Sequence, residues 1–283
     1  MGVWLVTGAS RGFGAEIVRE ALARGHQVVA AARNIEGIDS VFPDAGENLL
    51  PVSLDVTDER QAGAAVEAAK AAFGRIDVLV NNAGRGLLGA VEEAGDDEVR
   101  SVFETNVFGL LAVTRAVAPV LRAQRSGTIV NLSSVAGFVG NPGWGVYAAT
   151  KFAVEGLSEA LHGELAPLGI EVLIVEPGYF RTDFLDSMSL HATASAIDDY
   201  ADGPVGAVRT RAATVNHRQP GDPVKAAKAI VDVVESGKAP LRIQLGSDSI
   251  AAVENKLGRV RQELDLWRDV SAGTEHADAG TTR

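Results

Sequence analysis

The sequence predicts an α/β protein with a single doubly wound parallel sheet, helices on both faces of that sheet and a C-terminal helical extension. Short runs rich in β-branched residues alternate with longer segments of helical periodicity, which indicates parallel strands joined by crossover helices. These runs are continuously apolar rather than alternately apolar and polar, so helices should cover both faces. The expected strands are Val3–Thr7, Gln27–Ala31, Leu50–Leu54, Val78–Asn81, Thr128–Leu132 and Ile170–Val175.

The expected helices occupy the intervals between these strands and the region after the last one. Thr57 or Asp58 can cap the second helix, because each side chain offers an oxygen to unpaired backbone N–H groups. Gly169 can end the fourth helix in the left-handed conformation that glycine adopts without strain. The predicted helices cover residues 12–25, 58–73, 96–125, 147–168, Pro223–Glu235 and Asp248–Val270.

The domain organisation follows from the lack of any internal repeat or of a linker rich in Pro, Ser and Gly before the C-terminal end. We therefore expect one domain over residues 1–240, within which residues 185–222 are the least regular stretch. Residues 241–270 should extend the same domain. The small polar residues 271–283 should form a disordered tail.

The composition excludes several classes of protein. With 46% hydrophobic and 22% charged residues among 283, the chain can bury a substantial core, which argues against general disorder. The absence of cysteine excludes disulfides, a thiol nucleophile and cysteine-ligated metals. A net charge of −11, from 26 basic and 37 acidic residues, argues against nucleic acid or an anionic membrane as the partner. No apolar run approaches the roughly 18–20 residues of a membrane helix, and no secretory signal opens the chain, so we expect a cytoplasmic protein.

A glycine-rich segment, Thr7–Gly14, follows the first expected strand and opens the first expected helix. Its sequence, TGASRGFG, places glycine where the backbone must turn sharply and approach a ligand closely. The first turn of the helix then offers unpaired N–H groups to an anion, so the segment is a candidate phosphate site. A plain tight turn is the alternative. The candidate cofactor contacts here are Gly8, Ser10, Arg11, Gly12, Phe13 and Gly14.

Further motifs follow in order at the ends of the later strands and on the helices: Asn81-Asn82-Ala83-Gly84, Asn106, Ser134, Tyr147-x-x-x-Lys151 and Pro177-Gly178. Together with the glycine-rich segment, they resemble the short-chain dehydrogenase/reductase family over residues 3 to 240. The resemblance implies a Rossmann-like fold and hydride transfer between a nicotinamide cofactor and a small alcohol, ketone or aldehyde. It also implies that residues 185–222 form a flap over the substrate.

Tyr147 and Lys151 are the strongest catalytic candidates. They are four residues apart on an expected helix, so their side chains project from one face and can address one ligand. A free tyrosine has a pKa of about 10 and is a poor base at neutral pH. At an effective dielectric of 20, a cation about 4 Å from the phenolate stabilises it by roughly 4 kcal/mol, or about three pKa units. We therefore expect Lys151 to turn Tyr147 into a proton relay. An exposed lysine beside a half-buried tyrosine is the alternative.

Two further polar residues complete the expected catalytic set. Ser134 lies at the end of the fifth strand, where its hydroxyl can hold the substrate oxygen while charge develops on it. The chemistry alone does not separate it from Ser133, but the family resemblance selects Ser134. Asn106 interrupts an apolar helix pattern, which favours a buried amide that bonds to backbone and kinks the helix. The resemblance implies that Asn106 also supports a water relay to Lys151.

The residues at the end of the second strand indicate which nicotinamide cofactor binds. An acidic residue there would accept the ribose 2′-hydroxyl of NAD, whereas arginine would favour the 2′-phosphate of NADP. The sequence has Ala30-Ala31-Ala32-Arg33, and Arg11 adds a second cation. Guanidinium groups match phosphate oxygens, so we predict that NADP(H) is preferred over NAD(H). A strand-end arginine that is merely solvated is the alternative for Arg33.

The resemblance implies several other cofactor contacts. Asp55 would accept from the adenine amino group, although capping of the following turn is an alternative role for it. The segment after the sixth strand would contact the nicotinamide through backbone groups and the Thr182 hydroxyl. No metal is expected, because His191 and His217 have no partner at ligand spacing. The remaining implied contacts are Val56, Asn82, Ala83, Gly84, Pro177, Gly178 and Phe180.

Two rival functions and the assembly remain open at this point. A non-catalytic NADP-binding sensor would need no proton relay, and an epimerase or dehydratase would return its nicotinamide unchanged. The family often forms a homodimer or homotetramer, which the apolar content of helices 96–125 and 147–168 permits. The C-terminal helix could complete the substrate pocket, pack between subunits or stay solvated.

Overall fold

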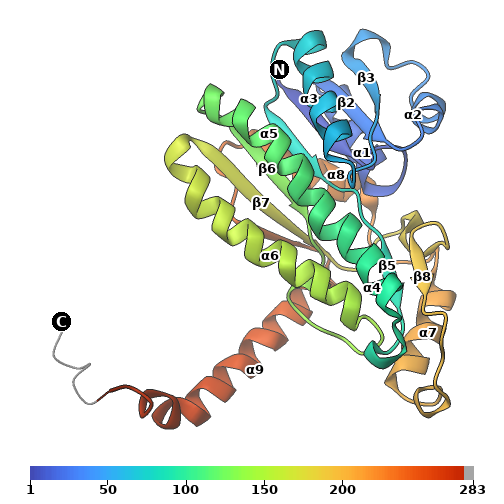
Figure 1. Ribbon diagram of the computed structural model, residues 1–283, viewed down its shortest axis with the longest axis vertical. Helices are drawn as coiled ribbons and strands as arrows, with labels where there is room; N and C mark the ends of the chain where they lie inside the picture. Colours follow the sequence, from blue (N-terminus) through green and yellow to red (C-terminus); the bar gives the residue numbers. More distant parts are fainter. Residues whose placement is uncertain (277–283) are drawn as a thin grey trace.

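A seven-stranded, wholly parallel sheet forms the centre of the molecule (Figure 1), which a computed structural model describes over residues 1–276. The strand order is β3-β2-β1-β4-β6-β7-β9. This order reverses direction between β1 and β4, and such a switch point leaves a crevice at the carboxyl ends of the strands. The predicted fold class is confirmed. The strands are β1 Val3–Thr7, β2 Gln27–Ala32, β3 Leu49–Ser53, β4 Val78–Asn81, β6 Gly127–Leu132, β7 Ile170–Pro177 and β9 Arg242–Leu245.

Helices cover both faces of this sheet. On one face, α1 and α8 pack over Trp4 and Val6 of β1; on the other, α3 and α5 pack over Val3 and Leu5. Every residue of β1 is buried, which explains why the strand is continuously apolar. The helices are α1 Gly12–Ala23, α2 Glu36–Val41, α3 Glu59–Phe73, α4 Asp96–Phe103, α5 Leu110–Gln124, α6 Gly145–Leu165, α7 Pro204–Val215, α8 Pro223–Glu235 and α9 Ser247–Ala272.

The expected helix ends are confirmed where the sequence offered a cap. Of the two candidates, Asp58 caps α3 by accepting from the backbone N–H of Arg60. A short 3₁₀ turn prolongs α6, and Gly169 then ends this helical segment by adopting a left-handed conformation, with a φ of +75°. These local signals place α3 and α6 correctly along the chain.

The expected single helix over residues 96–125 is divided. A π-helical segment, Glu104–Gly109, separates α4 from α5. The whole helical stretch Asp96–Gln124 is long and apolar enough to cross a membrane by length and composition. It contains no uninterrupted apolar run of that length, because Asn106 and Arg115 interrupt it. In this fold the stretch is a core helix, because Val113, Val117 and Leu121 are buried against the sheet.

The region 185–222 is more regular than the sequence indicates. It contains β8, Leu190–Ala192, and the helix α7. β8 pairs in parallel with β5, Gly86–Leu88, which follows the glycine of the Asn-Asn-Ala-Gly motif. This pairing attaches the flap to the edge of the crevice.

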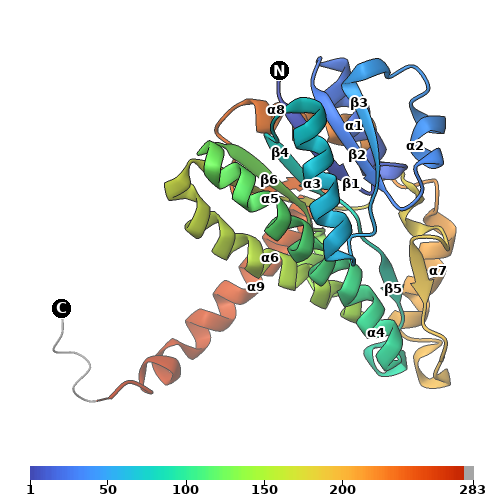
Figure 2. The ribbon, with the colours of Figure 1, turned by 45° about the horizontal axis from the view of Figure 1, so that its top comes forward.

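The C-terminal helix α9 leaves the body of the molecule and projects away from it (Figures 1 and 2). It extends to Ala272, so the first two residues of the predicted tail are helical. Residues 273–276 are exposed and not helical, and the predicted disordered tail from residue 277 on lies outside the described residues.

Candidate active site

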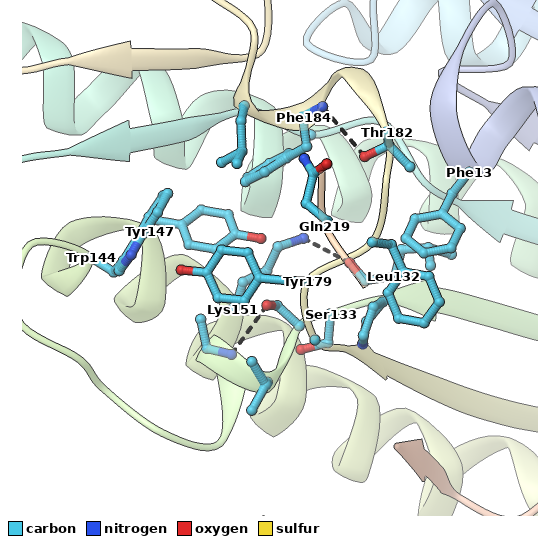
Figure 3. A pocket seen from close by; sticks show the side chains of 18 of the residues that line it. Phe13, Leu132, Ser133, Trp144, Tyr147, Lys151, Tyr179, Thr182, Phe184 and Gln219 are labelled. Atoms are coloured by element: carbon cyan, nitrogen blue, oxygen red, sulfur yellow. Dashed lines mark hydrogen bonds between the residues drawn. The ribbon is translucent and has the colours of Figure 1, made fainter. Parts of the chain in front are cut away.

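A pocket opens at the carboxyl end of the sheet and receives residues from β4, β6, β7, α6 and the flap (Figure 3). Trp144 and Tyr147 lie at one end of it and Phe13 at the other. The sequence-predicted residues that line this pocket are Phe13, Asn82, Gly84, Ser134, Tyr147, Lys151, Pro177, Gly178, Phe180 and Thr182.

Tyr147 and Lys151 lie on the first turns of α6 and are 7% and 6% exposed. The Lys151 ammonium donates a hydrogen bond to the Leu132 carbonyl at 2.7 Å, and its Nζ lies 5.8 Å from the centroid of the Tyr147 ring. The alternative of an exposed surface pair is therefore wrong. Both polar groups are withdrawn from solvent at the wall of one pocket.

The electrostatics of the pair differ from the sequence-based expectation. Burial raises the pKa of the Tyr147 phenol well above its ordinary value, and the neighbouring Ser134 hydroxyl offsets only part of that rise. Burial lowers the pKa of Lys151 to about 8, against the opposing charge of Glu155. The pKa of Tyr147 is set mainly by burial rather than by Lys151, whose ammonium donates to the Leu132 carbonyl. The phenol is therefore protonated at neutral pH.

Ser134 and Ser133 have different surroundings. Ser134 begins a 3₁₀ turn, where its Oγ accepts from the Ala136 N–H at 3.1 Å, and its hydroxyl acts to lower the pKa of Tyr147. Ser133 is buried and interacts with the carboxyl group of Glu155. Of the two hydroxyls, the geometry favours Ser134 as the one beside the phenol.

Asn106 lies in the π-helical segment and is buried. Its Oδ1 accepts from the Arg85 N–H, and its Nδ2 donates to the Arg85 carbonyl and to the Thr150 hydroxyl at 2.9–3.0 Å. The expected buried amide that bonds to backbone is confirmed. A π-bulge shifts the helical hydrogen bonds by one residue, and such bulges often mark functional sites. The water relay to Lys151 stays a prediction.

The glycine-rich segment has the geometry of a phosphate-binding turn. Gly8 and Gly12 have φ of +66° and +54°, which side-chain-bearing residues rarely adopt. No side chain caps α1 and its first turn carries no acidic residue, so its N–H groups are available to an anion. The Asn82 side chain donates to the carbonyls of Thr7 and Gly8, which fixes the segment to β4. The segment therefore fits the pyrophosphate of a dinucleotide.

The two predicted cations lie in different surroundings. The Arg11 guanidinium bonds to the Met188 carbonyl and the Ser189 hydroxyl of the flap region, so it is not free at the end of β2. Arg33 directly follows β2 and is exposed. Within residues 1–276 it makes no ion pair or side-chain hydrogen bond. Ser10 lies beside α2, since a β-carbon at Gly37 would be 3.5 Å from the Ser10 β-carbon.

The remaining predicted contacts are divided between the crevice and the core. Asp55 Oδ1 accepts from the N–H and hydroxyl of Thr57, so the alternative turn-capping role is observed. Val56 and Ala83 pack into the hydrophobic core beneath the crevice. Thr182 caps a short 3₁₀ turn, with its hydroxyl 3.4 Å from the Phe184 N–H.

Sequence reasoning missed several residues of the pocket. Gln219 lines it, is 1% exposed, and neither polar atom of its amide has a hydrogen-bond partner within the described residues. The Tyr147 ring packs against Trp144 and Phe184, with centroids 5.8 and 5.4 Å away. Tyr179 is also in the lining. Two of these residues carried a usable signal: Tyr179 lies inside the Pro177-Gly178 segment, and Trp144 lies between Ser134 and Tyr147, where an aromatic residue could face an apolar substrate.

Comparison with known proteins supplies the family. A family profile described as short chain dehydrogenase matches residues 2–192. The chain belongs to this family. A short-chain dehydrogenase of known structure from Streptomyces avermitilis has 43% identity and a TM-score of 0.90, over 97% of this chain and 100% of that one.

Two named oxidoreductases are also similar over most of their length. Oxidoreductase BOA17 of Botryotinia fuckeliana is 36% identical over 95% of this chain and 97% of its own. A 3-ketodihydrosphingosine reductase of Bacteroides thetaiotaomicron is 37% identical over 86% of this chain and 87% of its own. Similar solved structures include a short-chain dehydrogenase/reductase from Burkholderia phymatum in complex with NAD and the protein ElxO with NADP bound. The protein is an NAD(P)-dependent oxidoreductase of this family.

Proposed function

We propose that this protein is an NADP(H)-preferring oxidoreductase that interconverts an alcohol and a ketone or aldehyde, with Tyr147 as the proton donor or acceptor. One observation carries the proposal: the Tyr147 phenol, the Ser134 hydroxyl and the Lys151 ammonium converge on one pocket beside the glycine-rich segment. A nucleotide sensor would need the glycine-rich segment but not these three groups. The arrangement therefore favours catalysis over binding alone.

The residues of the pocket divide the chemistry between them. The reduced nicotinamide, when bound, supplies the hydride. Ser134 hydrogen-bonds the carbonyl oxygen and stabilises the charge that develops on it. Tyr147 Oη then gives its proton to that oxygen, which leaves an alcohol and a phenolate. Because burial keeps the phenol protonated at neutral pH, the free site is prepared for reduction.

The walls of the pocket indicate the substrate class. Val135, Trp144, Phe184 and Leu185 line the pocket with apolar surface, and the rings of Trp144 and Phe184 pack against that of Tyr147. An apolar ketone or alcohol would gain from burial here, whereas a carboxylate would lose its hydration. The name of the Bacteroides relative, 3-ketodihydrosphingosine reductase, likewise points to a ketone.

Replacing Tyr147 by Phe tests the proposal. The Tyr147→Phe variant should lose at least 99% of its NADPH-dependent reduction of a ketone and aldehyde panel, about 3 kcal/mol of barrier. It should keep NADPH affinity within about twofold, because the phenol oxygen is not needed to bind phosphates. The absorbance of NADPH measures the rate of reduction, and fluorescence titration measures the affinity for NADPH.

Tyr200→Phe is the matched control. Tyr200 lies in the flap and donates its hydroxyl to Glu92, away from the pocket, so turnover should not change. Residual activity of more than a few per cent in Tyr147→Phe would contradict the assignment. Tight NADPH binding by the native protein with no turnover of any compound would favour the sensor, and an isomerised product with unchanged nicotinamide would favour an epimerase.

The NADP preference is supported by Arg33 at the end of β2. A guanidinium with no protein partner can bond the 2′-phosphate, and a charge-assisted bond contributes about 1.5–3 kcal/mol. Arg33→Ala should therefore raise the KM for NADPH roughly 10- to 100-fold while changing that for NADH less than about twofold. Arg122→Ala, at the exposed end of α5, is the control. Equal effects of Arg33→Ala on both cofactors would contradict the preference.

A further inference from the structure

The helix α9 is an arm that the rest of the molecule does not support. Only Ser249 and Val253 of this helix are buried, and every residue from Leu257 to His276 is exposed. Figures 1 and 2 show the arm leaving the body in both views. Isolated helices of about 12–15 residues are marginal in water, so an arm of this kind gains stability from a partner.

The sequence of the arm carries an apolar stripe with the spacing of a coiled coil. The spacing alternates between three and four residues over nearly three heptads, which keeps the stripe on one face of the helix. The stripe consists of Ile250, Val253, Leu257, Val260, Leu264 and Trp267. All of these residues except Val253 are exposed, so the stripe does not form the core of this chain.

We propose that α9 is an association arm that pairs with α9 of a second copy of this chain as an antiparallel coiled coil. In the register that places Leu257 opposite Val260 of the partner subunit, Val253 faces Leu264 and Ile250 faces Trp267. Each apolar layer is then filled from both helices. The arrangement is a closed twofold interface, because each layer occurs twice about an axis between Gly258 and Arg259.

The charges beside the stripe favour pairing with a second copy of this chain, and they favour the antiparallel direction of the two helices. In this register Glu254 flanks Arg261 of the partner subunit, and Lys256 flanks Glu263 of the partner subunit, so all four flanking pairs are of opposite charge. Within residues 1–276, Glu254 and Lys256 have no ion pair of their own. A parallel pair would instead place Lys256 beside Arg261 of the partner subunit, a like-charge contact on each side, and only Glu263 would face an opposite charge, Arg268 of the partner subunit.

The geometry leaves room for both bodies. The two Ile250 side chains are 17 residues apart along the antiparallel pair, which at 1.5 Å per residue is about 26 Å. The bodies therefore lie at opposite ends of the pair, and the tip of each arm reaches the base of the other. This interface is separate from α5 and α6, the helices for which the sequence predicts subunit contacts.

Sedimentation of the full chain tests the interface. The Leu257→Glu/Leu264→Glu variant should have half the molar mass of the wild-type assembly, because two carboxylates then enter the apolar layers. Leu266→Glu is the matched control: Leu266 is 77% exposed and lies off the stripe, so the mass should not change. A wild-type monomer, or a double variant with the wild-type mass, would overturn the proposal; the latter result would indicate assembly through α5 and α6 alone.

A charge reversal tests the direction. Lys256→Glu should weaken association about tenfold, because it opposes Glu263 of the partner subunit, and Glu263→Lys in the same chain should restore it. Stronger association of Lys256→Glu would show a parallel pair and overturn the proposed register. No response to either change would overturn the pairing itself. Unchanged NADPH binding in each variant confirms that the body is folded.

Discussion

A β-carbon at Gly14 would lie 2.2 Å from the carbonyl oxygen of Gly8 and 2.5 Å from the Asn82 amide nitrogen. Neither neighbour can yield freely, because the carbonyl belongs to the backbone and the amide fixes the turn to β4. Gly14→Ala should therefore displace the glycine-rich segment and weaken NADPH binding by at least about tenfold. Fluorescence titration with NADPH measures the loss.

Gly63→Ala separates this steric effect from the general effect of removing a glycine. Gly63 lies inside α3, and a β-carbon there would have nothing within 4 Å. The substitution should leave NADPH affinity unchanged and stabilise the fold by about 0.5–1 kcal/mol, measured by urea unfolding. A Gly14→Ala variant that binds NADPH as well as Gly63→Ala does would show that the segment is not the phosphate site.

At the residue scale, the sequence predicts which residues come together in the site. It predicts less well how those residues interact. The motif order brings Tyr147, Lys151 and Ser134 together because each follows a strand whose carboxyl end lies at one edge of the sheet. The rise in the pKa of Tyr147 was not predictable, because the phenol is buried partly by Phe184, a residue of the distant segment that follows β7, in addition to its neighbour Trp144. Gln219 carried no local signal for the same reason.

Among the elements, those with their own periodicity or cap were predictable. The helix α8 matches its predicted bounds of Pro223–Glu235, and the six predicted strands are all present. The edge strand β9 was missed, since its sequence RIQL alternates polar and apolar residues over only four positions. It becomes a strand by pairing with β7.

The division of the long helix into α4 and α5 shows a second limit of prediction from the sequence. The sequence indicated a polar interruption at Asn106, but not a π-helical segment. The change in hydrogen-bond register is held by Arg85, before β5, and by Thr150, on α6. Neither partner is close in sequence, so helical periodicity alone carries no trace of them.

For the whole molecule, a buried acidic cluster joins the last third of the chain to the sheet. Glu176 of β7 is fully buried beside Glu155 of α6, and both carboxylates face the single guanidinium of Arg242 on β9, which also pairs with Glu159. Gln244 donates to Glu176, and Ser249 of α9 donates to the Glu176 carbonyl. One guanidinium cannot neutralise three carboxylates, so the cluster favours a retained proton.

The global stability should therefore depend on pH through Glu176. Burial and the charge of Glu155 raise its pKa to about 7, above the ordinary value of a glutamate in the unfolded chain. Between about pH 4.5 and 7 the folded protein then binds more protons than the unfolded chain, so its unfolding free energy falls as the pH rises. Above pH 7 this contribution is constant. Glu176→Gln keeps a neutral side chain, so it should remove roughly 1–3 kcal/mol of the fall between pH 5 and 8.

Urea unfolding at both pH values measures this difference, and Glu164→Gln is the control. Glu164 lies on the exposed end of α6, the helix that carries Glu155, and makes no ion pair within the described residues. Its substitution should leave the pH dependence of the wild type intact. If Glu176→Gln and Glu164→Gln lose the same stability from pH 5 to pH 8, then Glu176 is ionised in the folded protein. Arg242 would in that case neutralise both buried carboxylates, and the cluster would stabilise the fold most at high pH.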